Sequence, residues 1–304
     1  MSKQPTHIPV LLNETLEALQ VQPGSRYVDC TAGEGGHATA ILDKGAKLLA
    51  IDIDPHTIEV ARERLLPYGE NAILINESFE NLERICSETG FSPAQGVLFD
   101  LGMSSFQLAD ISRGFSFLRD SPLDMRYSPS QELSAATVVN TYPEHELATI
   151  IAKYGEERRS KTIARSIVAN RPIDTTLRLA AVVERTTGFR GKIHPATRTF
   201  QALRIIVNQE LRRLEAALKQ VADILCSGGR LVVISFHSLE DRLVKDYMRQ
   251  ESKDCLCPPE VPVCTCGHKA VLKLITKKVI TPSPAEVLAN PRSRSARMRV
   301  AERV

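Results

Sequence analysis

A glycine-rich segment at residues 32–37 is the first part of the chain whose residue types suggest ligand chemistry. It reads A-G-E-G-G-H and follows a short β-prone stretch, Arg26–Cys30. Glycine lets the backbone approach a ligand closely because it carries no Cβ. The G-x-G-x-x-G pattern of dinucleotide folds is absent, and Glu34 would repel a pyrophosphate. The segment therefore favours a cationic or zwitterionic ligand, such as the methionine part of S-adenosylmethionine, over a nicotinamide dinucleotide.

Acidic side chains follow the next apolar stretch of the chain. Asp52 and Asp54 end the run that begins at Lys47. In an open α/β sheet, a carboxylate at the carboxyl end of a strand can accept hydrogen bonds from both ribose hydroxyls. We expect Asp52 to face the ribose, while Asp54 caps the helix that begins at Pro55.

Two further residues after predicted strands complete the candidate cofactor pocket. Phe79 follows the strand Ala72–Asn76 and could cover an adenine ring, with core packing as the alternative role. Asp100 ends the apolar strand Gly96–Asp100, where it either faces the ligand or caps the next turn. Both predictions require that the sheet bring the ends of these strands to one edge.

Basic residues are concentrated in the later part of the chain. The net charge of +3 hides 7 Lys+Arg against 15 Asp+Glu in residues 1–100, and 15 against 6 in residues 151–220. This asymmetry favours a polyanionic partner for the later part, with a solvated helical surface as the alternative. The candidates for contact with RNA phosphates are Arg158, Arg159, Arg198, Arg204, Arg292 and Arg294.

Four of the seven cysteines lie close together in the sequence, namely Cys255, Cys257, Cys264 and Cys266. Four soft ligands on a short loop suit a tetrahedral zinc ion, although the one-residue spacing within each pair is tighter than usual. Reduced thiols without a metal are the alternative, since a cytosolic protein keeps its cysteines reduced.

These candidate residues need a sheet to position them. The first hundred residues alternate apolar strands with helices, which predicts a parallel sheet covered on both faces. Strand-forming sequence returns only at Gly229–Phe236, and Ala270–Ile280 with Ala296–Val300 predict a closing antiparallel pair.

The intervening segment lacks convincing apolar strands. Its predicted helices span Glu144–Lys153, Arg158–Ala169, Thr176–Thr186 and Thr197–Lys219. The sequence therefore predicts a Rossmann-like α/β sheet with an inserted all-helical domain. We expect the sheet domain to comprise residues 1–106 and 213–304, and the inserted helical domain residues 107–212.

The composition excludes several classes of protein. At 304 residues, 43% hydrophobic and 25% charged, the chain is too apolar for a disordered protein and long enough for one large or two modest domains. It contains no apolar run of the roughly 18 residues that a membrane helix needs, and no secretory signal pattern. We therefore expect a cytoplasmic protein without a membrane partner.

Several motifs, in order along nearly the whole chain, resemble the MraW (RsmH) family of bacterial methyltransferases. They are H-I-P-V-L-L-N-E from His7, G-E-G-G-H from Gly33, F-D-L-G-M-S-S from Phe99, R-G-F-S-F-L-R-D-S-P-L-D-M-R from Arg113, Y-G-E-E-R from Tyr154, H-P-A-T-R-T-F-Q-A-L-R-I from His194, I-S-F-H-S-L-E-D-R from Ile234 and N-P-R-S-R-S from Asn290.

The resemblance implies a class I S-adenosylmethionine-dependent methyltransferase that modifies the exocyclic N4 amine of a decoding-region cytosine in 16S ribosomal RNA. It implies 16S rRNA, within the small ribosomal subunit, as the partner, and leaves the oligomeric state open, a dimer included. The cofactor-binding residues that the resemblance implies are Gly35, Gly36, His37, Asp52, Phe79, Asp100 and Gln107, and we expect Gly33 of the glycine segment to bind cofactor beside them.

Methylation of a cytosine amine places particular demands on the site. The lone pair of this nitrogen is delocalised into the ring, so transfer needs close in-line positioning and a hydrogen-bond acceptor on the amine. The candidate catalytic groups are Asp100, Ser104, Ser105 and His237. Asp100 has the alternative role of binding cofactor, and His237 that of a structural residue beside a helix cap at Ser238. No single catalytic base is predicted.

Two other functions compete with this one. A small-molecule methyltransferase with a helical lid would not need the basic insert. An RNA-binding ribosome assembly factor without catalysis would not need the glycine segment together with Asp52 and Asp100.

Overall fold

A computed structural model describes residues 9–188, 194–258, 260 and 263–304. It divides the chain into two compact units. One, here called the sheet unit, comprises residues 1–102 and 213–304, and the other, here called the helical unit, comprises residues 103–212. His7, which begins the first family motif, lies outside the described residues.

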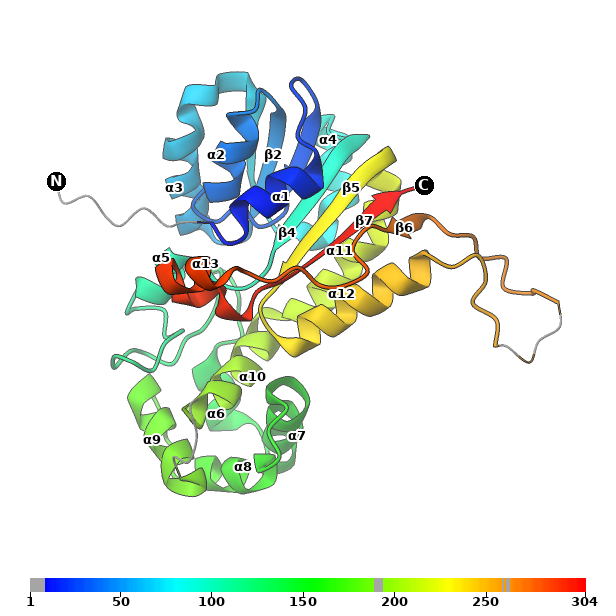
Figure 1. Cartoon of the computed structure of the whole chain (residues 1–304). Helices are drawn as coiled ribbons and strands as arrows, with labels where there is room; N and C mark the ends of the chain where they lie inside the picture. The colour runs from blue at the N-terminus through cyan, green and yellow to red at the C-terminus, as the bar shows by residue number, and fades with distance from the viewer. Residues whose placement is uncertain (1–8, 189–193, 259, 261–262) are drawn as a thin grey trace. The chain divides into compact units, whose positions relative to one another are not determined.

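The sheet unit is built on seven strands in the order β3-β2-β1-β4-β5-β7-β6 (Figure 1). The first five are parallel, while β7 runs antiparallel to both of its neighbours, β5 and β6. The strands are β1 (Arg26–Asp29), β2 (Lys47–Asp52), β3 (Ala72–Asn76), β4 (Ala94–Asp100), β5 (Leu225–Ser235), β6 (Leu272–Leu274) and β7 (Arg297–Arg303). The predicted parallel sheet with a closing antiparallel pair is therefore confirmed.

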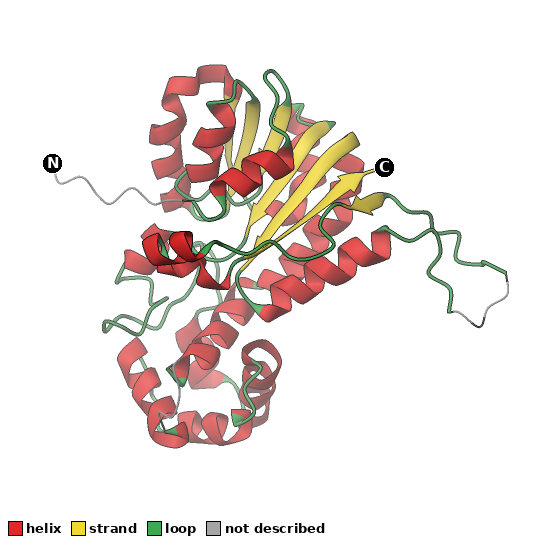
Figure 2. Cartoon of the chain, viewed as in Figure 1, coloured by secondary structure: helices red, strands yellow, loops and turns green. Residues whose placement is uncertain are grey.

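Helices cover both faces of this sheet (Figure 2). One face packs against α1 (Leu12–Leu19), α2 (Gly36–Leu42) and α3 (Pro55–Leu65), and the other against α4 (Leu82–Thr89), α11 (Glu210–Ile224) and α12 (Ser238–Glu251). The remaining helices of the unit are α13 (Pro284–Ala289) and the 3-10 segments η1 (Leu66–Asn71), η2 (Phe79–Asn81) and η3 (Pro291–Ser295).

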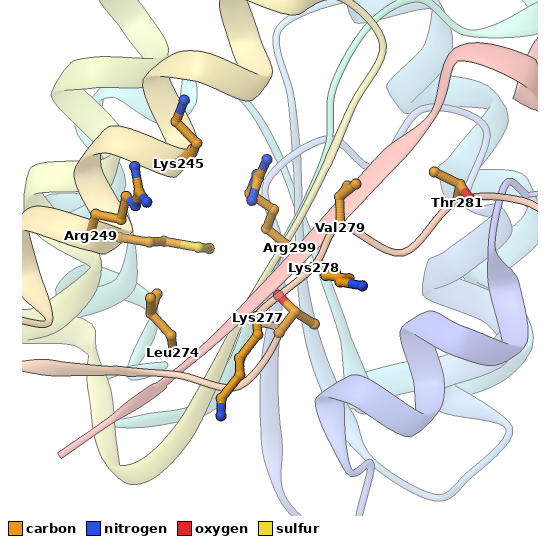
Figure 3. Close-up of a pocket in the computed structure, with 10 residues that line it drawn as sticks. Lys245, Arg249, Leu274, Lys277, Lys278, Val279, Thr281 and Arg299 are labelled. Carbon is orange, nitrogen blue, oxygen red and sulfur yellow. The ribbon is translucent and has the colours of Figure 1, made fainter.

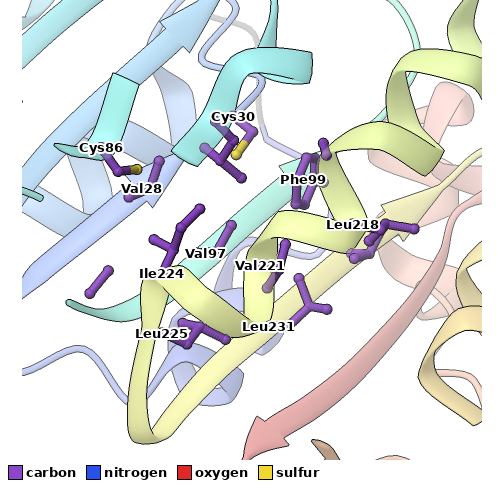
Figure 4. Packing of buried hydrophobic residues seen from close by; sticks show 14 of the residues in the cluster. Val28, Cys30, Cys86, Val97, Phe99, Leu218, Val221, Ile224, Leu225 and Leu231 are labelled. Atoms are coloured by element: carbon purple, nitrogen blue, oxygen red, sulfur yellow. The ribbon is translucent and has the colours of Figure 1, made fainter. Parts of the chain in front are cut away.

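The strand side chains alternate between the two faces, as the period of two in a pleated strand requires. In β4, Val97 and Phe99 belong to the core beneath α11, whereas Leu98 packs in the opposite core. Figure 4 shows Val97 and Phe99 close to Leu218 and Val221 of α11. Because both faces are buried, the carboxyl ends of the strands are the natural place for a ligand.

Within its described residues, the helical unit contains six further helices around its own buried aliphatic side chains. They are α5 (Ser105–Ala109), α6 (Ala135–Thr141), α7 (Glu144–Gly155), α8 (Ser160–Ala169), α9 (Thr176–Thr187) and α10 (Ala196–Asn208). The expectation of an all-helical insertion in the α/β sheet is therefore confirmed.

One predicted helix is wrong. The continuous helix Thr197–Lys219 is instead two helices, because α10 ends at Asn208 and α11 begins at Glu210. Gln209 between them adopts the left-handed conformation with φ 51°. The buried Asn208 amide donates to the carbonyls of Met125 and Arg204, which fixes the chain at this point. The helices α1, α5, α6 and α13 were not predicted.

No helix within the described ranges has the length and apolar character required to span a bilayer.

Candidate active site

The glycine segment connects β1 to α2 and is organised by Asp52. Gly33 N donates to Asp52 Oδ2 over 2.8 Å, and Asp54 N donates to Asp52 Oδ1 over 2.8 Å. One carboxylate therefore holds both the glycine loop and the turn that leaves β2. Asp54 accepts from His56 N at the start of α3, so the predicted cap at Asp54 is confirmed.

Two glycines of the segment meet demands that other residues would not. Gly35 caps α2 with φ 80°, in the left-handed region that favours glycine. A Cβ at Gly36 would lie 2.6 Å from Pro9 Cγ, closer than two carbon atoms can approach. Glycine at 35 therefore allows the turn into α2, and glycine at 36 leaves room for Pro9 beside it.

Three carboxylates lie near one another at the ends of adjacent strands. Burial raises the pKa of Asp29 to about 6, and the negative charges of Asp100 and Asp52 add to this effect. Burial likewise raises the pKa of Asp52 to about 6, with a contribution from Asp54. Burial and the repulsion between like charges both disfavour ionisation of these carboxylates. A cationic ligand would offset the repulsion and favour their ionised forms.

His37 lies against this cluster from the first turn of α2. Its Nε2 is 3.3 Å from Asp100 Oδ2, and its side chain is 5% exposed. Burial disfavours the charged imidazolium, but the close contact with Asp100 and the negative charges of Asp100 and Asp29 more than offset it and raise the pKa of His37. The pair partly neutralises the pocket and orients the Asp100 carboxylate.

Asp100 has one oxygen still available. Its backbone N–H donates to Thr31 Oγ1 over 2.6 Å, which ties β4 to the end of β1. Among the described residues, Asp100 Oδ1 and both ring nitrogens of His37 are buried without a hydrogen bond of ordinary geometry, although His37 Nε2 lies 3.3 Å from Asp100 Oδ2. Buried polar atoms without partners are uncommon and mark places where a ligand can bind.

Phe79 lies in η2, directly after β3. Its ring meets Phe99 edge to face, with centroids 5.6 Å apart and an interplanar angle of 87°. Phe79 is only partly buried and packs at the margin of the core. The core contact is therefore present, and the exposed part of the ring remains for a ligand.

Ser104 and Gln107 belong to the helical unit, where they form a capping box at the start of α5. Gln107 N donates to Ser104 Oγ over 3.1 Å, and Ser104 N donates to Gln107 Oε1 over 3.0 Å. The hydroxyl of Ser104 thus has a structural role in the helix cap. Ser105 is the first residue of α5.

His237 is the N-cap of α12, a position that the sequence analysis assigned to Ser238. Its Nδ1 accepts from Glu240 N at 3.3 Å, and its Nε2 lies 3.1 Å from Glu240 Oε1. Glu240 Oε2 in turn accepts from Phe236 N. Both side chains are less than a tenth exposed, so this pair is first of all a structural element after β5.

The arginines suggested for RNA divide into two groups. Arg204 is 12% exposed and forms a bidentate pair with Glu210 over 2.8 and 3.0 Å, so its charge is used within the helical unit. The exposed arginines are Arg158, Arg159 and Arg198 in the helical unit, and Arg292 and Arg294 in η3 of the sheet unit.

A basic groove that the sequence analysis missed lies on the sheet unit beside α12 (Figure 3). Its volume is about 580 Å³, and its cationic lining residues are Lys245, Arg249, Lys277, Lys278 and Arg299. Arg299 is bidentate to Asp241, which also pairs with Arg297, so β7 presents both arginines to one carboxylate. Two features of the sequence could have indicated this groove. Lys277 and Lys278 are adjacent, and Lys245 and Arg249 are four residues apart, which places them on one side of a helix.

The four clustered cysteines lie on the loop between α12 and β6. Their sulfur atoms all lie within 4.8 Å of one another. Hydrogen bonds from Leu256 N and His268 N lower the pKa of the Cys266 thiol to about 6.

The chain also matches known proteins. A model of the MraW methylase family matches residues 4–304. The chain is 56% identical to the "Ribosomal RNA small subunit methyltransferase H" of Dehalococcoides mccartyi, over 98% of this chain and 86% of that protein. Proteins with the same name from Thermomicrobium roseum and Carboxydothermus hydrogenoformans are 52% and 47% identical, over 98% of this chain and 94% and 98% of those proteins.

Proposed function

The chain belongs to the MraW methylase family of S-adenosylmethionine-dependent methyltransferases, and from this membership we propose that it methylates the exocyclic N4 amine of a decoding-region cytosine in 16S ribosomal RNA. The observation that carries the proposal is the cluster of Asp29, Asp52 and Asp100 beside the glycine segment. Buried carboxylates that repel one another suit a sulfonium and an ammonium group better than a neutral or anionic ligand.

The residues of the sheet unit divide the binding of the methyl donor among them. The glycine segment at the start of α2 contacts the methionine part, and Asp52 accepts hydrogen bonds from the ribose hydroxyls. Asp52 is suited to this task because Gly33 N and Asp54 N already fix its orientation. The exposed part of the Phe79 ring covers the adenine.

The transfer itself is a displacement at the methyl carbon. The N4 lone pair attacks this carbon as the carbon–sulfur bond breaks, and S-adenosylhomocysteine leaves as a neutral thioether. The nitrogen then gives up one proton. We assign Asp100 as the acceptor, because its Oδ1 has no partner among the described residues, whereas the Ser104 hydroxyl and His237 serve helix caps. His37 holds the other Asp100 oxygen.

The substrate is a polyanion, which the basic surfaces support. Arg158, Arg159 and Arg198 of the helical unit are exposed, and the groove beside α12 supplies further cations on the sheet unit. Such contacts give affinity and register on RNA without reading its sequence. They favour RNA over a small molecule as the methyl acceptor.

The proposal is tested by mapping methylated cytosines in 16S rRNA from cells that lack the gene. We expect N4-methylcytosine to be missing at one decoding-region position, and to return with the wild-type gene but not with Asp52→Ala. A parallel assay supplies labelled methyl donor to the purified chain with naked 16S rRNA or with small subunits. No loss of a cytosine methyl group in the first experiment, or labelling at a carbon atom of the base, would refute the assignment.

A further inference from the structure

We propose that Cys255, Cys257, Cys264 and Cys266 bind one structural zinc ion through four thiolates. Of the sulfur pairs, Cys255–Cys264 is separated by 3.3 Å, Cys264–Cys266 by 3.5 Å and Cys266–Cys255 by 3.8 Å. A tetrahedral zinc site with Zn–S bonds of about 2.3 Å places its sulfur atoms about 3.8 Å apart. Three of the thiols are therefore already arranged at nearly the spacing that zinc requires, and Cys257 Sγ lies within 4.8 Å of each of them.

Backbone N–H groups on both sides of the loop donate hydrogen bonds to the cysteine sulfur atoms. Leu256 N donates to Cys266 Sγ over 3.3 Å, and Thr265 N donates to Cys257 Sγ over 3.4 Å. A third bond runs from Cys257 N to Cys255 Sγ. Hydrogen bonds of this kind orient thiolate ligands and offset part of their charge.

Hydrophobic packing does not explain why the sulfurs converge. None of the described residues between Lys253 and Lys269 is buried, and the apolar Leu256 and Val263 are 38% and 71% exposed. In Figure 1 the loop, in orange, extends away from the sheet beyond the ends of α12 and β6. A short segment without a core of its own needs another source of order, and a bound metal supplies it in small domains.

The chemistry of the four cysteine ligands indicates which metal ion they would bind. Four thiolates suit a soft or borderline ion with tetrahedral geometry, and the cluster offers no carboxylate for magnesium or calcium. Four protein ligands leave no open position for water or substrate, which is the arrangement of a structural site. The ion would fix the loop that joins α12 to β6, the two elements beside the basic groove.

The test measures zinc in the purified full-length chain by plasma mass spectrometry, using a preparation that avoids chelators and metal-affinity columns. We expect one zinc per chain in the wild type and in Cys226→Ser, which alters a cysteine outside the cluster. We expect the double variant Cys255→Ser, Cys264→Ser to lose the metal. Cobalt added to the zinc-free protein should give the absorption bands of a tetrahedral thiolate complex.

Two controls keep the result decisive. Calorimetric binding of S-adenosylmethionine by the double variant reports whether the sheet unit is folded, and we expect it to match the wild type. Thiols counted in denaturant without reductant, after zinc removal, should number seven, as in the sequence. A loss of two or four thiols would indicate disulfides, and zinc content that is negligible or equal in all variants would also overturn the proposal.

Discussion

The pocket at the strand ends and the arginine surface of the helical unit use charge in opposite ways. In the pocket, Asp29 is 1% exposed and Asp52 is held by two backbone N–H groups, so the charges are confined and their positions are fixed. On the helical unit, Arg158 and Arg198 are exposed. The Arg198 side chain is 56% exposed even though it pairs with Glu157. A confined charge depends on every neighbour, whereas exposed charges act nearly independently and are screened by salt.

The strongest test of the pocket is Asp100→Asn. The amide keeps the shape but cannot take up a proton, so we expect the methyl transfer rate to fall about 10²–10⁴-fold. Affinity for S-adenosylmethionine should change much less than the rate. Single-turnover kinetics and calorimetry separate the two quantities. Asp43→Asn, at an exposed acid of the same unit, is the matched control. An equal loss in rate and cofactor affinity would assign Asp100 to binding alone.

Asp52→Ala should have the next largest effect. It removes the proposed ribose acceptor and releases Gly33 N and Asp54 N from their shared partner. Because a hydrogen bond to a charged group contributes about 1.5–3 kcal/mol, we expect S-adenosylmethionine to bind about 100-fold or more weakly. Titration calorimetry measures this, with the exposed Asp223→Ala as control. Wild-type affinity in Asp52→Ala would place the ribose elsewhere.

Substitutions on the arginine surface of the helical unit should reduce RNA affinity in smaller steps. Reversal of Arg158, Arg159 and Arg198 to Glu should weaken binding of 16S rRNA about 30-fold at low salt and flatten its salt dependence. Each single reversal should account for part of this loss, and S-adenosylmethionine should bind as in the wild type. Filter binding over a range of salt concentrations provides the measurement. Arg26→Glu, at an exposed residue of β1, tests the effect of charge alone. Unchanged RNA affinity in the triple variant would exclude these arginines.

The smallest predicted effect is that of pH on the pocket. The pKa values of Asp29 and Asp52 are raised to about 6 in the free protein, and a cationic ligand favours their ionised forms. Binding should therefore release protons near pH 6, and affinity should fall about tenfold between pH 7.5 and pH 5.5. Calorimetry in buffers of different ionisation enthalpy measures both quantities. Proton uptake on binding would contradict the sign of this linkage.

The same two groups affect the stability of the free protein. Their folded-state pKa values exceed the unfolded value of about 4, so their contribution to stability is complete below pH 4 and is lost as pH rises through about 6.

Local signals predicted some of this site well. Asp54 followed by Pro55 is a strong signal for the start of a helix. This signal correctly assigned the helix cap to Asp54 and not to Asp52. The strands were predictable because continuous apolar runs leave few alternatives in a covered sheet. The motifs also identified the family, which chemistry at single positions could not have done.

Other features depend on tertiary contacts and leave no local trace. The sequence around Gln209 contains neither Gly nor Pro, yet the helix ends there because Asn208 binds the carbonyl of Met125 far along the chain. Asp29 is the last residue of β1, and only the folded sheet brings the carboxylates of Asp52 and Asp100 near it. His237 was difficult to assign because a histidine cap depends on the partner Glu240.

The helical unit joins the rest of the chain at only two points, after Gly102 and before Arg213. Insertions of this kind can be gained, lost or exchanged between genes without rearranging the order of the strands. A lineage could thus keep one methyl-donor pocket while it acquires new acceptors by replacing the segment between these two points. Grafting an unrelated helical segment there is a route to redirecting the enzyme that leaves the strand-end carboxylates in place.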